Sequence, residues 1–108
     1  MKLVYLASPY SAYKGGREEA YQLVCKKAAE LMDEHTAVFC PIAHSHAVET
    51  VSGMEIKDGD WWLKQDFAVL MACDELYVYC MEGWDKSYGV SKEVQFARDW
   101  DIPVSYID

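Results

Sequence analysis

Four short, mostly apolar runs recur along the chain, and the stretches between them are long enough to form helices. The runs lie at residues 2–7, 36–41, 75–80 and 103–107 and favour buried strands. Strands that alternate with helices predict a parallel sheet with right-handed crossovers. We therefore expect one α/β domain over residues 1–108, a flavodoxin- or Rossmann-like three-layer fold with about four parallel strands and helices on both faces.

The stretches between the runs differ in periodicity. Residues 17–34 carry apolar side chains three or four positions apart, which predicts a helix. A second helix is expected over residues 61–73, with Asp60 as its N-cap, and a third over residues 94–100. Residues 42–59, which include two glycines, are expected to be irregular. A loop of that length is usually a lid, a binding loop or a subunit contact.

Charge and hydropathy narrow the classes of partner. The net charge of −8 argues against a nucleic-acid backbone as the main partner, although it leaves room for a small nucleotide. No apolar run approaches the roughly 20 residues that span a bilayer, so no membrane partner is expected. The chain enters its first strand without a signal-peptide pattern, so a cytoplasmic location is expected.

Cysteines and histidines give no metal pattern. No C-x-x-C spacing occurs, so buried free thiols are expected at Cys25, Cys40, Cys73 and Cys80. His44 and His46 lack a third ligand at a plausible spacing, so no metal is expected, and His44 is predicted to bond either substrate or backbone. No cofactor is expected; a small flavoprotein is the weakest alternative.

Two carboxylates occupy the apolar sides of their predicted helices. At about 100° per residue, Glu93 falls in the middle of a stripe formed by Val90, Phe96, Ala97 and Trp100. Asp66 lies in the same way among Trp62, Leu63, Val69, Leu70 and Cys73. Such acids must be paired, protonated or used in chemistry. The alternative for Glu93 is a structural one: either a first-turn carboxylate that interacts favourably with the helix dipole, or a side chain at the edge of the stripe that reaches water.

Two loops after predicted strands have the composition of ligand-binding loops. Open α/β sheets bind ligands beyond the carboxyl ends of their strands, where helix N-termini attract anions. Gly83 and Gly89 allow close backbone approach in the loop over residues 83–93. The first loop, with Ser8, Tyr10 and Ser11, leads to Arg17, which is either an anion contact or a solvated helix end.

These residues together resemble a known family. The matching segments are Tyr-Leu-Ala-Ser-Pro-Tyr-Ser at 5–11, Arg17, Pro-Ile-Ala-His-Ser at 41–45, Asp66, and a glycine-rich segment from Gly83 to Glu93. The pattern resembles short, uncharacterised proteins allied to the nucleoside 2-deoxyribosyltransferase superfamily, which also contains nucleoside 5′-monophosphate N-glycosidases. That resemblance implies a flavodoxin-like fold and sites that borrow residues from a neighbouring subunit.

The resemblance also implies residue roles. Glu93 becomes the nucleophile that attacks C1′ of the sugar, and Asp66 becomes a contact to sugar or base. The loop with Ser8 and Ser11, together with Arg17, becomes the site of the 5′-phosphate. Either Tyr5 or Tyr10 takes the role of the tyrosine that orients the nucleophile.

The chain departs from the superfamily hallmark, Asp-x-Gly-Thr-x-x-Glu, at two positions. Ser87 stands where the hallmark has Asp, and Val90 where it has Thr, whereas Gly89 and Glu93 match. Asp85, two residues earlier, is a candidate replacement for the missing acid. The departure leaves open whether the protein transfers the sugar or is active at all.

The expected function is therefore an N-glycosidase or deoxyribosyltransferase acting on a nucleoside or its 5′-monophosphate. The alternative is a non-catalytic nucleotide-binding or sensor domain. Trp62 and Trp84 are candidates to stack on the base, with plain packing as the alternative for each. The many aromatic and Met residues predict that a second copy covers part of the surface, in a dimer or larger homo-oligomer.

Overall fold

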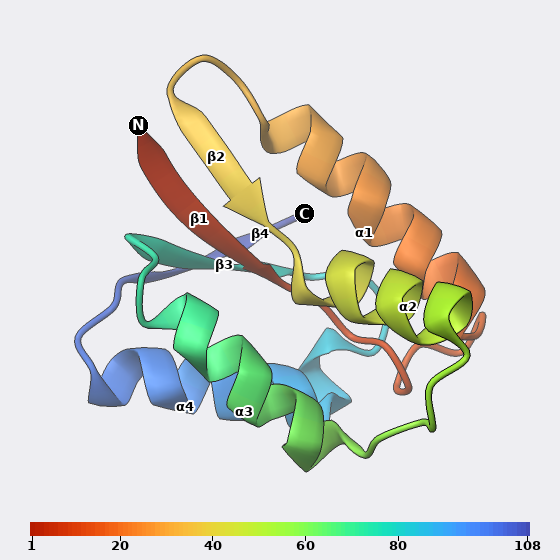
Figure 1. Ribbon diagram of the computed structural model, residues 1–108. Helices are drawn as coiled ribbons and strands as arrows, with labels where there is room; N and C mark the ends of the chain where they lie inside the picture. The colour runs from red at the N-terminus through yellow and green to blue at the C-terminus, as the bar shows by residue number, and fades with distance from the viewer.

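The computed structural model describes all residues, 1–108, and contains a four-stranded parallel sheet. The strands are β1 (Lys2–Ala7), β2 (Thr36–Phe39), β3 (Glu75–Tyr79) and β4 (Val104–Ile107). They are arranged in the order β2-β1-β3-β4 (Figure 1). The predicted α/β class and the four parallel strands are confirmed.

Four helices surround the sheet. They are α1 (Arg17–Leu31), α2 (Pro41–Ser52), α3 (Gly59–Leu70) and α4 (Tyr88–Asp99), and a short 3₁₀ turn spans Trp84–Lys86. Helix α1 covers one face of the sheet, and α3 and α4 lie side by side on the other (Figure 1). No helix is both long enough and apolar enough to cross a membrane.

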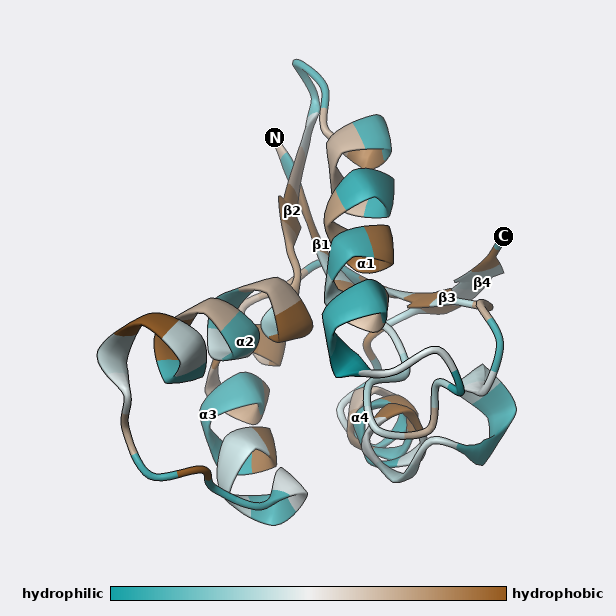
Figure 2. Ribbon diagram, turned by 90° about the vertical axis from the view of Figure 1, so that its right-hand side faces the viewer, coloured by the Kyte–Doolittle hydropathy of each residue, from teal (hydrophilic) through white to brown (hydrophobic).

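The alternation of side chains along β1 divides the core between the two faces. Leu6 is fully buried with Val24 of α1. Tyr5 and Ala7 point to the other face, where Leu70 of α3 belongs to the same buried cluster. Hydrophilic positions lie along the outer side of α1 (Figure 2). Because successive strand residues face opposite ways, Tyr5 is placed on the side of α3 and α4.

Helix α2 corrects the prediction of an irregular segment at residues 42–59. Pro41 opens this helix at a position where a missing N–H costs nothing, since the first helical amides have no intrahelical acceptor. Gly53 ends it in the left-handed conformation, with φ 67°, and its N–H bonds to the carbonyl of Glu49. Only the short connection 53–58 before α3 is irregular.

The N-caps of α3 and α4 fix where each helix begins. The carboxylate of Asp58, rather than that of the predicted Asp60, accepts a hydrogen bond from Trp61 N at 2.8 Å. The hydroxyl of Ser87 accepts from Val90 N at 3.2 Å, so α4 begins at Tyr88, earlier than predicted. Glu93 therefore lies in the second turn of α4.

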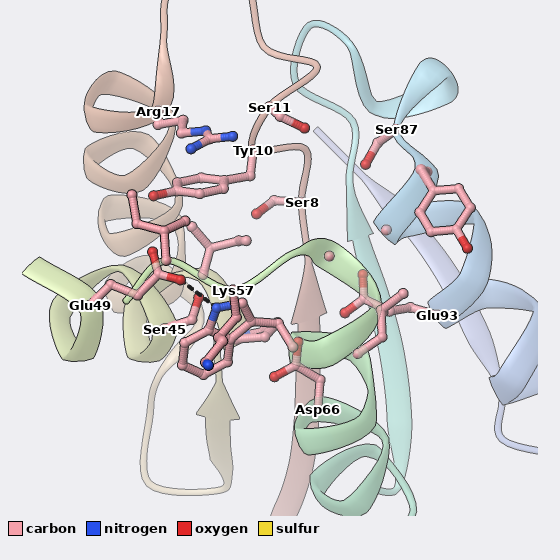
Figure 3. Close-up of a pocket in the computed structure, with 18 residues that line it drawn as sticks. Ser8, Tyr10, Ser11, Arg17, Ser45, Glu49, Lys57, Asp66, Ser87 and Glu93 are labelled. Carbon is pink, nitrogen blue, oxygen red and sulfur yellow. Dashed lines mark hydrogen bonds between the residues drawn. The ribbon is translucent and has the colours of Figure 1, made fainter. Parts of the chain in front are cut away.

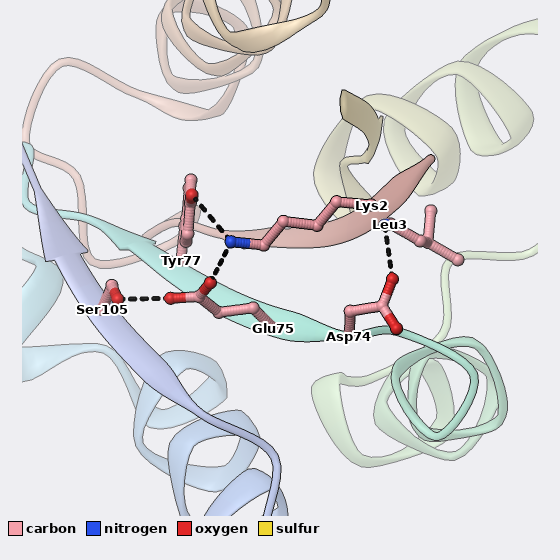
Figure 4. A network of polar contacts seen from close by, with 6 residues as sticks. All are labelled: Lys2, Leu3, Asp74, Glu75, Tyr77 and Ser105. Atoms are coloured by element: carbon pink, nitrogen blue, oxygen red, sulfur yellow. Dashed lines mark hydrogen bonds and ion pairs between the residues drawn. The ribbon is translucent and has the colours of Figure 1, made fainter. Parts of the chain in front are cut away.

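A polar network ties together the amino ends of three strands (Figure 4). The Lys2 ammonium contacts Glu75, whose carboxylate also accepts from Ser105. Asp74 accepts a hydrogen bond from Leu3 N at 2.7 Å. These contacts stand at one end of the sheet, and the loops that form the cavity described below leave the other, carboxyl end.

The four cysteines are free, as predicted. Cys40 and Cys73 are buried, whereas Cys25 and Cys80 are half-buried. Burial raises the pKa of the Cys40 thiol to about 12 and that of Cys73 to about 11. These two thiols are protonated at neutral pH and act as small apolar side chains.

Candidate functional site

A cavity of about 180 Å³ lies beyond the carboxyl ends of β1, β2 and β3 (Figure 3). Its walls come from the β1–α1 loop, from α2 and the connection 53–58, and from α3 and the start of α4. Among the predicted site residues, it is lined by Ser8, Tyr10, Ser11, Arg17, Trp62, Asp66, Ser87, Gly89 and Glu93. Residues far apart in the chain thus converge where a parallel sheet offers a ligand site.

Two carboxylates enter this cavity from adjacent helices. Glu93 on α4 is 5% exposed, and Asp66 on α3 is 8% exposed. Figure 3 shows both side chains directed into the same space. Both acids are buried, as their places in the apolar stripes predicted. A pair of buried acids beside a cavity is a constellation used in acid–base and nucleophilic chemistry.

Tyr5 holds the Glu93 carboxylate. Its phenol donates a hydrogen bond to Glu93 Oε2, and its side chain is fully buried on β1. Tyr10, the other candidate for this role, instead bonds to His46. The residue that orients Glu93 is therefore Tyr5.

Burial perturbs the protonation of both acids. It raises the pKa of Glu93 to about 8; the Tyr5 hydrogen bond opposes this rise, and the nearby Asp66 charge adds to it. Burial also raises the pKa of Asp66 to about 7. Because the two acids interact, the protons belong to the pair rather than to either residue.

The opposite side of the cavity is suited to an anion. The hydroxyl of Ser8 is buried and has no hydrogen-bond partner. Arg17 makes no ion pair, and its guanidinium lies over the Tyr10 ring, with Cζ 5.4 Å from the ring centroid. On the α4 side of the cavity, Gly89 lies in the first turn of the helix, whose amides have no intrahelical acceptors. A buried hydroxyl without a partner is costly, so the Ser8 side of the cavity favours a polar ligand.

Further residues line the cavity that were not predicted as site residues, among them Ser45, Glu49, Ile56 and Lys57. Trp62 Nε1 donates a hydrogen bond to the Glu49 carboxylate, which connects α3 to α2 beside the cavity. Ser45 and Glu49 are four residues apart on α2, so the helical spacing after Pro41 was the signal that could have found them.

Four predicted residues do not line the cavity: Tyr5, which reaches Glu93 from β1, and three residues that make no contact with the cavity, His44, Trp84 and Asp85. Asp85 is exposed on the 3₁₀ turn, and Trp84 packs against Tyr106, with ring centroids 5.4 Å apart. His44 is exposed on α2 beside Phe39, with centroids 6.0 Å apart. The 3₁₀ turn directs the chain away from the cavity until Ser87. Asp85 is therefore not in contact with this cavity, and Ser87 uses its hydroxyl as a helix cap.

The fold and the cavity define a small α/β domain with a cavity at the carboxyl edge of its parallel sheet. The chain belongs to the family described as Domain of unknown function (DUF1937), whose model matches residues 2–108. No curated protein matches the chain. The structure contains no group of three or more His, Cys, Asp or Glu side chains that could hold a metal ion.

Proposed function

We propose that this protein cleaves the N-glycosidic bond of a nucleoside 5′-monophosphate or nucleoside, with Glu93 as the nucleophile. The observation that carries the proposal is the buried Glu93 carboxyl, held by Tyr5, facing the same cavity as Asp66. The resemblance to the nucleoside 2-deoxyribosyltransferase superfamily, described above from the sequence motifs, supports the same chemistry.

The reaction proceeds in two steps from the form of the pair in which Glu93 is ionised and Asp66 holds the proton. Burial raises the pKa of Glu93 to about 8 and that of Asp66 to about 7, so this is the less populated of the two singly protonated forms. In the first step, the carboxylate of Glu93 forms a bond to C1′ as the bond from C1′ to the base nitrogen breaks. Protonated Asp66 gives its proton to the departing base. In the second step, water attacks C1′ and releases Glu93, and Asp66 takes a proton from that water. A second base in place of water gives transfer instead of hydrolysis.

The 5′-phosphate is assigned to the other side of the cavity. Ser8 offers an unpartnered hydroxyl, Ser11 a second hydroxyl, and Arg17 a guanidinium without a carboxylate partner. Arginine suits phosphate because its planar donors match two phosphate oxygens. Trp62, on the α2–α3 side, supplies an aromatic surface for the base.

A chromatographic assay for free base tests the proposal. Purified protein is incubated with a panel of nucleosides and their 5′-monophosphates, with and without a second free base. We expect release from monophosphates that falls at least 100-fold in Glu93→Gln and is retained in Glu34→Gln, a matched change at an exposed position. Release only when a second base is present indicates transfer. Equal release by wild type and Glu93→Gln excludes Glu93 as nucleophile.

A second candidate function is a binding or sensor domain without turnover. Two observations favour it. The pKa of Glu93 is about 8, which leaves this carboxyl largely protonated at neutral pH, and Ser87 stands at the hallmark acid position. Thermal stabilisation by a nucleotide that is recovered intact supports this function over catalysis.

We also propose a homo-oligomer, with a cytoplasmic location as expected from the sequence. Large apolar side chains are exposed at Val51, Ile56, Trp61 and Tyr88, and two of them, Ile56 and Tyr88, line the cavity. A second copy would remove them from water. Light scattering coupled to size-exclusion chromatography measures the mass, and a monomer at all concentrations contradicts the proposal.

A further inference from the structure

A cluster outside the cavity connects α2 to the anion-binding side. His46 on α2 contacts the Tyr10 hydroxyl through Nδ1 at 2.6 Å and Glu18 through Nε2 at 2.8 Å. Its ring stacks on Tyr21 of α1, with centroids 4.1 Å apart and planes 17° apart. The imidazole is therefore held by two hydrogen bonds and one ring face.

One neutral tautomer of His46 satisfies both contacts. The Nε2–H donates to the Glu18 carboxylate, and the Nδ1 lone pair accepts the Tyr10 O–H. The Tyr10 hydroxyl is thereby committed to His46 and is not the donor that a ligand meets. Tyr10 takes part in the cavity through its ring.

The position of the Tyr10 ring bears on Arg17. Both side chains line the cavity, and the guanidinium lies over the ring face. Tyr10 belongs to the loop between β1 and α1, outside any regular element, whereas His46 sits on α2. His46 itself does not line the cavity, so any effect on a ligand passes through Tyr10.

We propose that His46 is a positioning residue for the phosphate of a nucleoside 5′-monophosphate. Its hydrogen bond holds the Tyr10 ring in place, and the ring in turn holds the Arg17 guanidinium where it can bind that phosphate. This inference rests on the proposed assignment of the phosphate to Arg17. It does not require turnover, because binding alone tests it.

The test is equilibrium binding in a Glu93→Gln background, in which the proposed cleavage is blocked. Isothermal titration calorimetry uses the common ribo- and deoxyribonucleoside 5′-monophosphates, their phosphate-free nucleosides, and inorganic phosphate. His46→Phe keeps an aromatic ring against Tyr21 and removes both hydrogen bonds. We expect five- to tenfold weaker binding of monophosphates and of phosphate, roughly the contribution of one hydrogen bond, and unchanged binding of nucleosides.

Two further variants separate positioning from general damage to the fold. Tyr10→Phe removes the same hydrogen bond from its other end, so its loss should match that of His46→Phe, and the double variant should lose no more than either alone. His46→Asn places an amide oxygen near the Nδ1 position and should recover part of the affinity. His35→Phe, the same change at an exposed turn, should bind like its background.

The outcomes distinguish this inference from the proposed function. If His46→Phe weakens monophosphate binding but wild type releases no base, positioning stands and catalysis falls. If the His46→Phe variant binds monophosphates as tightly as its Glu93→Gln background does, the inference is overturned, whether or not the wild type releases base. Equal losses for nucleosides and monophosphates, additive losses in the double variant, or no binding of any monophosphate or of phosphate also overturn it.

Discussion

Replacing Glu93 by Gln should stabilise the fold at neutral and alkaline pH. The carboxyl is buried, and burial raises its pKa from an ordinary 4.5 to about 8. A glutamine of the same shape needs no ionisation, and its side-chain oxygen still accepts the Tyr5 hydrogen bond. The variant therefore removes the cost of a buried charge while keeping its main contact.

The magnitude follows from linkage between proton binding and folding. Because the pKa is higher in the folded chain than in the unfolded chain, the folded protein holds this proton more tightly. The contribution to stability is complete below about pH 4.5 and is lost as the pH rises to about 8. A tenfold change in an ionisation constant corresponds to 1.36 kcal/mol, so the full loss is on the order of 4–5 kcal/mol.

Urea unfolding followed by tryptophan fluorescence at pH 4.5, 6, 7 and 8 measures this difference. We expect wild type and Glu93→Gln to differ by less than about 1 kcal/mol at pH 4.5, and the variant to gain roughly 3–5 kcal/mol by pH 8. Glu34→Gln, at an exposed position, supplies the baseline. A difference that stays constant with pH, or a wild type more stable at pH 8, would refute the description of Glu93 as a buried acid with a raised pKa.

Two further predictions concern the support of the site. Tyr5→Phe removes a hydrogen bond that lowers the pKa of Glu93, so that pKa should rise above its wild-type value; ¹³C NMR of the Glu93 carboxyl measures it, and a lower value contradicts the assignment. Gly83 has φ 91°, and an added Cβ would lie 2.5 Å from the Ala12 carbonyl oxygen. Gly83→Ala should therefore lower the free energy of unfolding by about 2–4 kcal/mol, as measured by urea unfolding. Gly59→Ala, which meets no atom within 4 Å, should change stability by less than about 1 kcal/mol, and equal losses in the two variants would contradict the role of the close contact.

The strands were predictable because their signal is local. Each apolar run is bounded by a polar or helical stretch, and strand–helix alternation allows few arrangements other than a parallel sheet. Helix α2 was not predicted because Pro41 ends an apolar run, which was read as the end of a strand. The same proline also opens a helix, since it is well suited to the first helical position. Glycine at 53 marked the end of that helix rather than the middle of a loop.

Site residues were predictable from the sequence where helical geometry determines the direction of the side chain. Glu93 and Asp66 lie in apolar stripes, so their inward direction follows from a fixed angle per residue. Asp85 and Trp84 lie in a turn, where neighbouring residues can point in any direction, and the structure places both outside the cavity. Spacing in the chain therefore identified the acids on helices and failed for residues in the turn.

The sequence by itself determined the four strands, three of the four helices and the burial of the two acids, since these follow from periodicities along the chain. Only the tertiary structure decided that Tyr5, rather than Tyr10, holds Glu93, and that His46 holds Tyr10. These partners are 88 and 36 residues apart. Contacts between residues so far apart in the sequence depend on how the helices pack against the sheet. That arrangement is set by the packing of the whole core rather than by any local pattern.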